Sequence, residues 1–160
     1  MIRINLYCIG TLKEDYFIKM CLEYLKRLQK FAKISVFEFK ECVFSGNENN
    51  NNLEDFLEKE DSQILSKLGK DDYVILLDLH GKEISSEQFA KSFQDVISTL
   101  RGDVDFVIGG TYGVSKSLQN RANFRWKFSE LTFTHQMCRP LLLEQIYRAF
   151  KINNNEKYHH

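Results

Sequence analysis

The stretch YVILLDL, residues 73–79, is a nearly continuous apolar run, and it decides the fold class. A run of this length and composition is typical of a strand that is covered on both faces. A second run, VDFVI at residues 104–108, has the same character and is followed by Gly109 and Gly110. Strands buried on both faces belong to parallel sheets that carry helices on each side. We therefore expect an α/β fold with a largely parallel sheet.

On either side of these runs, strand and helix patterns alternate along the chain. Period-two alternation and β-branched or aromatic residues predict strands, whereas apolar residues at helical spacing predict amphipathic helices. The predicted strands are residues 2–9, 34–39, 73–79, 104–108 and 125–129. The predicted helices are residues 12–31, 53–68, a helix from a Ser85–Gln88 capping box to near Gly102, a short one after Ser115, and residues 140–152. No linker or internal repeat divides residues 1–160, so we expect one domain.

Composition favours a folded cytoplasmic protein. The chain has 160 residues, of which 43% are hydrophobic and 28% are charged, as in globular domains. No apolar run approaches the roughly 20 residues that span a bilayer, and the N-terminus is too short and too alternating for a secretory signal. We expect no membrane segment. The polar stretch GNENNNN, residues 46–52, is predicted to be a mobile surface loop.

The cysteines predict neither disulfides nor a metal site. Cys8, Cys21, Cys42 and Cys138 form no CxxC pair and have no spaced histidine partner. Such cysteines are usually small buried hydrophobes, and Cys138 is the best candidate among them for a reactive thiol.

Charge is unevenly distributed although its formal sum is zero. Residues 41–72 hold nine acids against three bases, and residues 116–160 hold eight bases against three acids. This asymmetry suggests an acidic face and a basic face that attracts phosphate.

Three segments follow predicted strands, where ligands of open parallel sheets bind. The glycine-rich segment, residues 108–115, lacks the GxGxxG pattern and the lysine of a phosphate-binding loop. Its backbone N–H groups suit an anion or an adenine edge, or the segment is a plain tight turn. The other two segments are LDLHGK, residues 77–82, and FSELTFTHQMCR, residues 128–139, whose histidine is either structural or catalytic.

The end of the chain combines aromatic and basic residues. Glu144, Arg148 and Lys151 are three or four residues apart, so they share one face of the last predicted helix and can pair. The final Tyr-His-His can stack on bases and neutralise phosphate, or it can fray as an unpacked tail.

Six motifs follow one another along the chain: INLYCIGTLKEDYF, LDLHGK, VIGG-x-x-G, FS-x-LTF-x-HQM-x-R, LLLEQIYRAFKI and a terminal YH. Taken together, they resemble the RlmH (YbeA) family of SPOUT-class methyltransferases. The resemblance covers residues 2–159, with only the asparagine-rich insert unlike the family. Each motif is weak alone, but their order and spacing together are specific.

The resemblance implies an enzyme that methylates N3 of a pseudouridine in 23S ribosomal RNA of the assembled ribosome. It further implies S-adenosylmethionine as methyl donor, a homodimer, and a single SPOUT domain whose C-terminal segment forms a trefoil knot. The residues alone favour an unknotted doubly wound sheet, because knots are rare. Two alternatives stay open: another uridine-type base in tRNA or rRNA as substrate, and a ribosome-binding or nucleotide-sensing protein without catalysis.

The resemblance also implies site residues. Cofactor contacts are expected at Leu77, Gly109, Phe128, Ser129, Glu130, Leu131, Thr132 and Phe133. His135 is expected to be the general base. Arg139 and Arg148 are expected to stabilise the imide anion or to hold RNA phosphate. Tyr158 and His159 are expected to contact RNA, in a site that the partner subunit shares.

Two residues depart from the pattern of the family. Thr134 stands where relatives have proline, and Pro140 stands where they have an aliphatic residue. Proline in a helix interior costs about 3 kcal/mol, so we expect Pro140 in the first turn of the last helix or at a kink.

Overall fold

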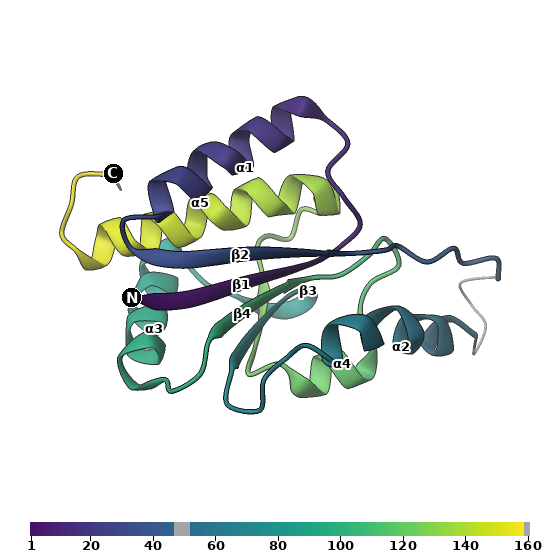
Figure 1. The fold of residues 1–160 in the computed structure, drawn as a ribbon. Helices are drawn as coiled ribbons and strands as arrows, with labels where there is room; N and C mark the ends of the chain where they lie inside the picture. The colour runs from purple at the N-terminus through teal and green to yellow at the C-terminus, as the bar shows by residue number, and fades with distance from the viewer. Residues whose placement is uncertain (47–51, 159–160) are drawn as a thin grey trace.

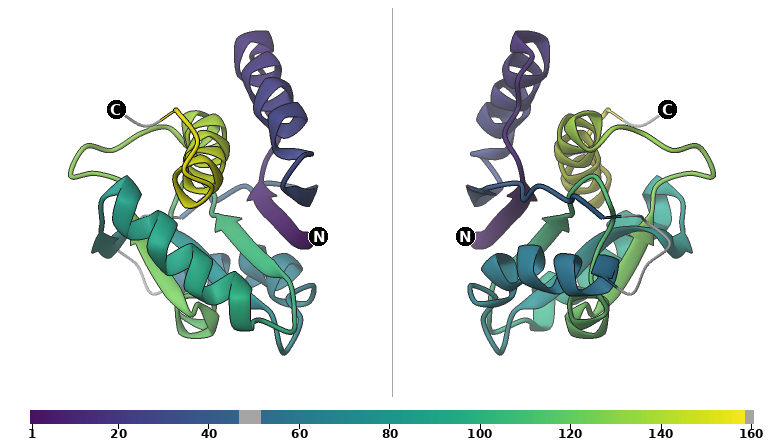
Figure 2. Two further views of the ribbon diagram at one scale, coloured as in Figure 1. Left: turned by 90° about the vertical axis from the view of Figure 1, so that its left-hand side faces the viewer. Right: turned by 90° about the vertical axis from the view of Figure 1, so that its right-hand side faces the viewer.

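Helices cover both faces of one five-stranded sheet in the computed structural model, which describes residues 1–46 and 52–158 (Figures 1 and 2). The strands are β1 (Ile2–Ile9), β2 (Ala32–Phe39), β3 (Tyr73–Glu83), β4 (Val104–Ile108) and β5 (Phe124–Lys127). The helices are α1 (Asp15–Leu28), α2 (Asn52–Leu65), α3 (Ser86–Thr99), α4 (Lys116–Arg121) and α5 (His135–Asn153). Every predicted element is present, with boundaries that differ by a few residues.

The sheet has the order β2-β1-β4-β3-β5, and every pair in it is parallel. The strands at its centre are the two apolar runs and the first strand of the chain. All carboxyl ends therefore meet at one edge of the sheet, which confirms the predicted parallel α/β architecture.

Two apolar cores lie on opposite faces of the sheet. Helix α5 lies between α1 and α3 on one face, and α2 and α4 cover the other (Figure 2). Successive residues of β4 alternate between the cores: Phe106 belongs to the first and Val107 to the second. All five residues of β4 are buried, as its composition predicts.

Serine and threonine side chains start three of the helices. Ser85 and Gln88 form the predicted capping box of α3. Ser115 Oγ accepts from the backbone N–H of Leu118 at the start of α4. Thr134 caps α5 in the same way, so this helix begins at His135 and not near residue 140 as the apolar spacing predicted.

Pro140 is in the second turn of α5, inside a continuous helix. Of its two expected places, the first turn is wrong, because the helix starts earlier than predicted, and the kink stays a prediction. Its ring is buried, and its missing N–H removes the bond that would close on the carbonyl of Gln136.

The segment LDLHGK is not a free loop. Strand β3 continues through it to Glu83, with a shift in register against β5 between Leu77 and Lys82. A Cβ atom on Gly81 would lie 2.5 Å from the carbonyl oxygen of Arg125. Glycine is therefore required here because the backbones of β3 and β5 approach closely.

Four further expectations concern the polar loop, the cysteines, membrane-spanning helices and the knot. Of the predicted polar loop, residues 47–51 lie outside the described residues. Cys8 and Cys21 are buried, whereas Cys42 and Cys138 are half-buried. Within residues 1–46 and 52–158, no helix has the length and apolar character needed to cross a membrane. The trefoil knot stays a prediction of the resemblance.

Candidate functional site

A cavity of about 880 Å³ lies at the carboxyl edge of the sheet. Three strand-end segments line it: Leu77–His80, Ile108–Val114, and most of residues 126–138. Glu14 and Phe17 at the start of α1 line it as well. Ligand pockets generally enclose about 300–1,000 Å³. The three segments singled out from the sequence thus converge on one cavity of ligand size.

The glycine-rich segment forms a tight turn on one side of the cavity. The backbone N–H of Gly113 donates to the carbonyl of Gly110 at 3.3 Å, and Gly113 has a φ of 102°. A Cβ atom on Gly109 would lie 2.5 Å from Val114 Cγ1, and one on Gly110 would lie 2.5 Å from Glu60 Oε1. These glycines let the backbone lie where side chains would not fit, so peptide groups face the cavity.

Side chains from outside the cavity hold this turn in place. The hydroxyl of Thr111 donates to Glu41 Oε1 at 2.5 Å. The ring of Tyr112 packs edge-on against Phe44 and Phe56, with centroids 5.3 and 5.8 Å away. The sequence pattern did not predict these partners, because they come from the segment after β2 and from α2.

The segment before α5 presents apolar side chains beside the cavity. Leu131 is 70% exposed and Phe133 is 37% exposed, although both line the cavity. Ser129 Oγ accepts from the backbone N–H of Leu131 at 3.0 Å, which bends the segment. Exposed leucine and phenylalanine side chains next to a pocket are typical of a surface that a ligand covers. Phe128 and Ser129 line the cavity too, whereas Glu130 and Thr132 are exposed and outside its lining.

Glu130 forms an ion pair with Lys127 at the end of β5. This pair lies on the surface, because the Glu130 side chain is largely exposed. Leu77 and Gly109, the other predicted cofactor contacts, both line the cavity.

The floor of the cavity contains an acid that sequence reasoning missed. Asp78 is buried and lines the cavity. One of its oxygens accepts from Arg125 Nε at 2.7 Å and the other from the backbone N–H of His80 at 2.9 Å. Asp78 therefore joins β3 to β5 beside the cavity that it lines.

His135 is the first residue of α5 and lines the cavity. Thr134 fixes its position by capping the helix, with Oγ1 accepting from the backbone N–H of Met137 at 3.3 Å. The neighbouring Gln136 accepts from the backbone N–H of Lys13. The histidine is thus held between the α1 loop and the cavity, half-buried, where its ring can meet a bound molecule.

Arg139 is not part of the lining. It is buried, and its guanidinium donates to Glu38 Oε2 at 2.6 Å and to the carbonyl of Gly10 at 3.3 Å. These bonds join α5 to the ends of β1 and β2. Burial of the cation is offset by a carboxylate and a carbonyl, which gives Arg139 a clear structural role.

Arg148 and Tyr158 are not part of the cavity lining of their own chain. Arg148 follows Cys138, the last lining residue of α5, by ten residues, a rise of about 15 Å along the helix axis. Tyr158 packs beside Arg148. The remaining predicted RNA contact, His159, lies outside the described residues. The described residues contain no group of three or more His, Cys, Asp or Glu side chains that could hold a metal ion.

Comparison with known proteins agrees with this geometry. The family model described as "Predicted SPOUT methyltransferase" matches residues 2–159. Proteins named ribosomal RNA large subunit methyltransferase H from Clostridium novyi and Fusobacterium nucleatum are each 42% identical to this chain, over 98% of both sequences. A probable methylase family protein from Haemophilus influenzae has a similar fold, with a TM-score of 0.51 at 11% identity over 99% of this chain and 70% of that one. The chain therefore belongs to the SPOUT methyltransferase family.

Proposed function

We propose that this protein transfers a methyl group from S-adenosylmethionine to N3 of a pseudouridine in 23S ribosomal RNA of the assembled large subunit. The observation that carries the proposal is the convergence of three strand-end segments on one cavity, in a chain similar over its whole length to proteins named for large-subunit rRNA methylation. We place the enzyme in the cytoplasm, where ribosomes work.

The lining of the cavity suits an adenosyl ligand. Peptide groups of the turn at Gly109–Gly113 offer donors and acceptors to an adenine edge, and Leu77, Leu131 and Phe133 offer apolar surface to its faces. Glycine at position 109 keeps the backbone close enough for such bonds. The expected contacts at Glu130 and Thr132 would require their backbone, because their side chains are exposed.

The chemistry is a displacement at carbon. Bound S-adenosylmethionine supplies a methyl group activated by its sulfonium. The N3–CH3 bond forms as the S–CH3 bond breaks, and the N3 proton must leave. His135 lies at the cavity with a ring nitrogen able to accept that proton. Positioning of the two reactants supplies much of the rate.

The distance between the cavity and the tail favours a homodimer. Neither Arg148 nor Tyr158 lines the cavity of its own chain, and about 15 Å of α5 separates Arg148 from Cys138, the last lining residue of that helix. A second copy would bring these side chains to RNA beside a bound methyl donor. Tyr16, Met20 and Met137 are exposed apolar side chains on α1 and at the start of α5, and they offer surface for such an association. In that dimer, Arg148 and the tail would stabilise the imide anion or hold phosphate in the partner's site.

Methyl transfer from radiolabelled S-adenosylmethionine tests the proposal. The acceptors are ribosomes from a strain lacking this enzyme, the separated subunits, and bulk tRNA. Label in the large-subunit RNA alone, followed by mapping of the base, is the expected result. Label in tRNA would overturn the substrate while keeping the cofactor. Absence of label together with absence of S-adenosylmethionine binding would overturn the proposal and favour a non-catalytic ribosome-binding protein.

A further inference from the structure

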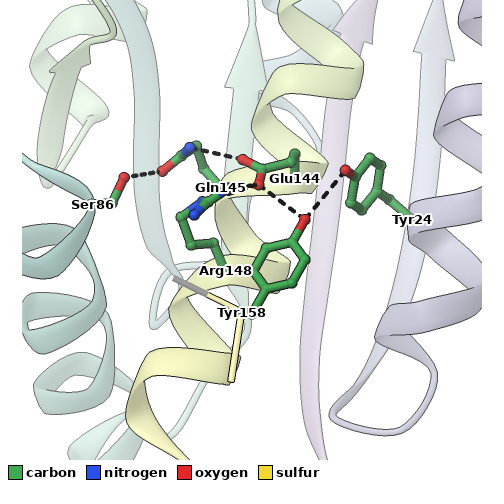
Figure 3. A network of polar contacts seen from close by, with 6 residues as sticks. All are labelled: Tyr24, Ser86, Glu144, Gln145, Arg148 and Tyr158. Carbon is green, nitrogen blue, oxygen red and sulfur yellow. Dashed lines mark hydrogen bonds and ion pairs between the residues drawn. The ribbon is translucent and has the colours of Figure 1, made fainter. Parts of the chain in front are cut away.

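Glu144 on α5 has a largely buried carboxylate outside the cavity lining, and this carboxylate accepts several hydrogen bonds (Figure 3). Glu144 Oε1 accepts from Nε and Nη2 of Arg148 at 3.0 and 2.5 Å, and from the hydroxyl of Tyr158 at 3.1 Å. Its second oxygen accepts from the side-chain amide of Gln145 at 2.8 Å. One carboxylate therefore holds two of the side chains that the resemblance assigns to RNA, Arg148 and Tyr158.

The same network joins three helices. Ser86 Oγ on α3 donates to the amide oxygen of Gln145 at 2.7 Å, and the hydroxyl of Tyr24 on α1 lies 3.4 Å from that of Tyr158 (Figure 3). Helix α5 is thus fixed to its neighbours on both sides at the level of Glu144. Networks of this kind restrict each member to one rotamer when all of them are bonded.

Burial makes the ion pair sensitive to the loss of either partner. The side chain of Glu144 is 13% exposed and that of Arg148 is 24% exposed. The hydrogen bond from Arg148 to Glu144 raises the pKa of the guanidinium, which stays charged. An arginine that loses its carboxylate in such surroundings is expected to move toward solvent or another anion.

The chain after α5 reverses so that Tyr158 meets this pair. Asn155 has a φ of 54°, and the backbone N–H groups of Asn155 and Glu156 donate to the carbonyls of Ile152 and Lys151. These are the two bonds of a Schellman motif with asparagine in the left-handed position. An ion pair between Lys151 and Glu156 adds to the reversal. The turn directs residues 156–158 back along α5.

The ring of Tyr158 is packed as well as hydrogen-bonded. It meets Tyr147 edge-on at 4.9 Å between centroids, and the guanidinium carbon of Arg148 lies 4.8 Å from its centroid. Burial and the contacts with Tyr24 and Glu144 raise the pKa of the Tyr158 hydroxyl, which remains a donor. The last described residue of the tail is therefore held in one place.

We propose that Glu144 is a positioning residue of the RNA site: it fixes the guanidinium of Arg148 and the tail at Tyr158 in the geometry that RNA requires. The part of this inference that concerns RNA rests on the proposed function. It predicts that Glu144 acts on RNA recognition and leaves cofactor binding alone, because Glu144 is not part of the cavity lining and follows Cys138, the last lining residue of α5, by six residues.

Glu144→Gln is the first test, since it keeps the shape of the side chain and removes its charge. We expect kcat/KM for ribosomes to fall about tenfold, with the Kd for S-adenosylmethionine unchanged within about twofold. Asp95→Asn, which removes one exposed carboxylate from α3, is the matched control and should behave as wild type. Wild-type kcat/KM in Glu144→Gln would overturn the proposal. So would a loss shared equally by cofactor binding, which would mark a general structural role.

A second readout needs no methyl transfer, so it separates this proposal from the proposed function. Lys157 is exposed and precedes Tyr158, so trypsin cleavage there, followed by mass spectrometry, reports release of the tail. Cleavage should accelerate severalfold in Glu144→Gln and stay at the wild-type rate in Asp95→Asn. An unchanged cleavage rate in Glu144→Gln would contradict the proposal even if kcat/KM for ribosomes fell.

Tyr158→Phe keeps the ring and removes only the hydroxyl that donates to Glu144. If Glu144 acts partly through the tail, this variant loses part of the ribosome kcat/KM, and adding it to Glu144→Gln causes less further loss than it does alone. Additive losses would contradict a shared action of the two residues.

Discussion

Gly109 and Gly113 are required for different reasons, and this difference is testable residue by residue. A methyl group on Gly109 would collide with Val114 Cγ1, whereas Gly113 has open space around it but a φ of 102°. Gly109→Ala should raise the Kd for S-adenosylmethionine about tenfold, because the turn must shift to relieve the contact. The double variant Gly109→Ala/Val114→Ala should recover most of that affinity in calorimetric titration. No recovery would mean that Val114 is not the obstacle.

His135 carries the prediction with the largest effect on rate. Replacement by alanine should lower kcat about a hundredfold or more, as expected for loss of a general base, with S-adenosylmethionine binding unchanged. Single-turnover methylation of ribosomes measures the chemical step directly. A variant with normal turnover would assign the histidine a purely structural place at the start of α5.

At the scale of elements, α5 contains a residue, Pro140, that destabilises the helix in which it lies. Pro140 removes a backbone hydrogen bond in the second turn. Pro140→Ala should therefore raise the free energy of unfolding by about 1–2 kcal/mol, less than the full helix penalty because proline also restricts the unfolded chain. Urea unfolding measures the change. A destabilised variant would show that packing of the buried ring outweighs the missing bond.

Two substitutions at Asn155, in the turn after α5, should have opposite effects on the tail. Asn155 has left-handed backbone geometry, which glycine adopts freely and β-branched residues avoid. Asn155→Gly should leave the tail in place. Asn155→Val should release it at a cost of about 1–2 kcal/mol and accelerate trypsin cleavage after Lys157. Equal cleavage rates in the two variants would contradict a role for this turn in holding the tail.

Elements were predictable from sequence where periodicity was strong, and less so where a single cap or bulge set the boundary. The buried run at 104–108 and the Ser85–Gln88 box gave β4 and the start of α3 correctly. The start of α5 was missed because the Thr134 cap precedes five residues with no clear apolar period. The predicted end of β3 was too early, because a glycine such as Gly81 is typical of a turn. The close approach of β5, which explains this glycine, leaves no signal in the local sequence.

The candidate site was predictable only in its strand-end segments. Because parallel strands place their carboxyl ends together, these segments had to meet. The supports around them come from distant parts of the chain, as Glu41 and Arg125 do, and local pattern contains no signal for such pairs.

For the whole molecule, stability should depend on pH through buried acids whose pKa values are raised by burial, and one of these, Asp105, lies at the opposite edge of the sheet. Asp105 is buried beside Asn5, Asp72 and Asp103, and burial, followed by these neighbouring carboxylates, raises its pKa from 3.8 to about 7. The folded chain then binds a proton that the unfolded chain has already released. Stability should therefore fall as pH rises between these two values, and should level off above the upper one.

Urea unfolding at pH 5 and pH 8 measures this loss, which we expect to be about 2 kcal/mol after solvent screening. Asp105→Asn should reduce the dependence to the part that Glu60 and Asp61 contribute, because burial raises their pKa values too, whereas Asp95→Asn should preserve it in full. A wild-type protein equally stable at both values would show that Asp105 ionises in the folded chain without penalty.

The position of α5 between α1 and α3 also bears on how the chain is made. Helix α5 supplies Leu142, Ile146 and Phe150 to a core whose other walls precede it in the chain. A nascent chain therefore exposes the apolar sides of α1 and α3 until the residues of α5 have been synthesised and can pack between them. An enzyme proposed to act on ribosomes would thus have an open core of its own while it is being made on one.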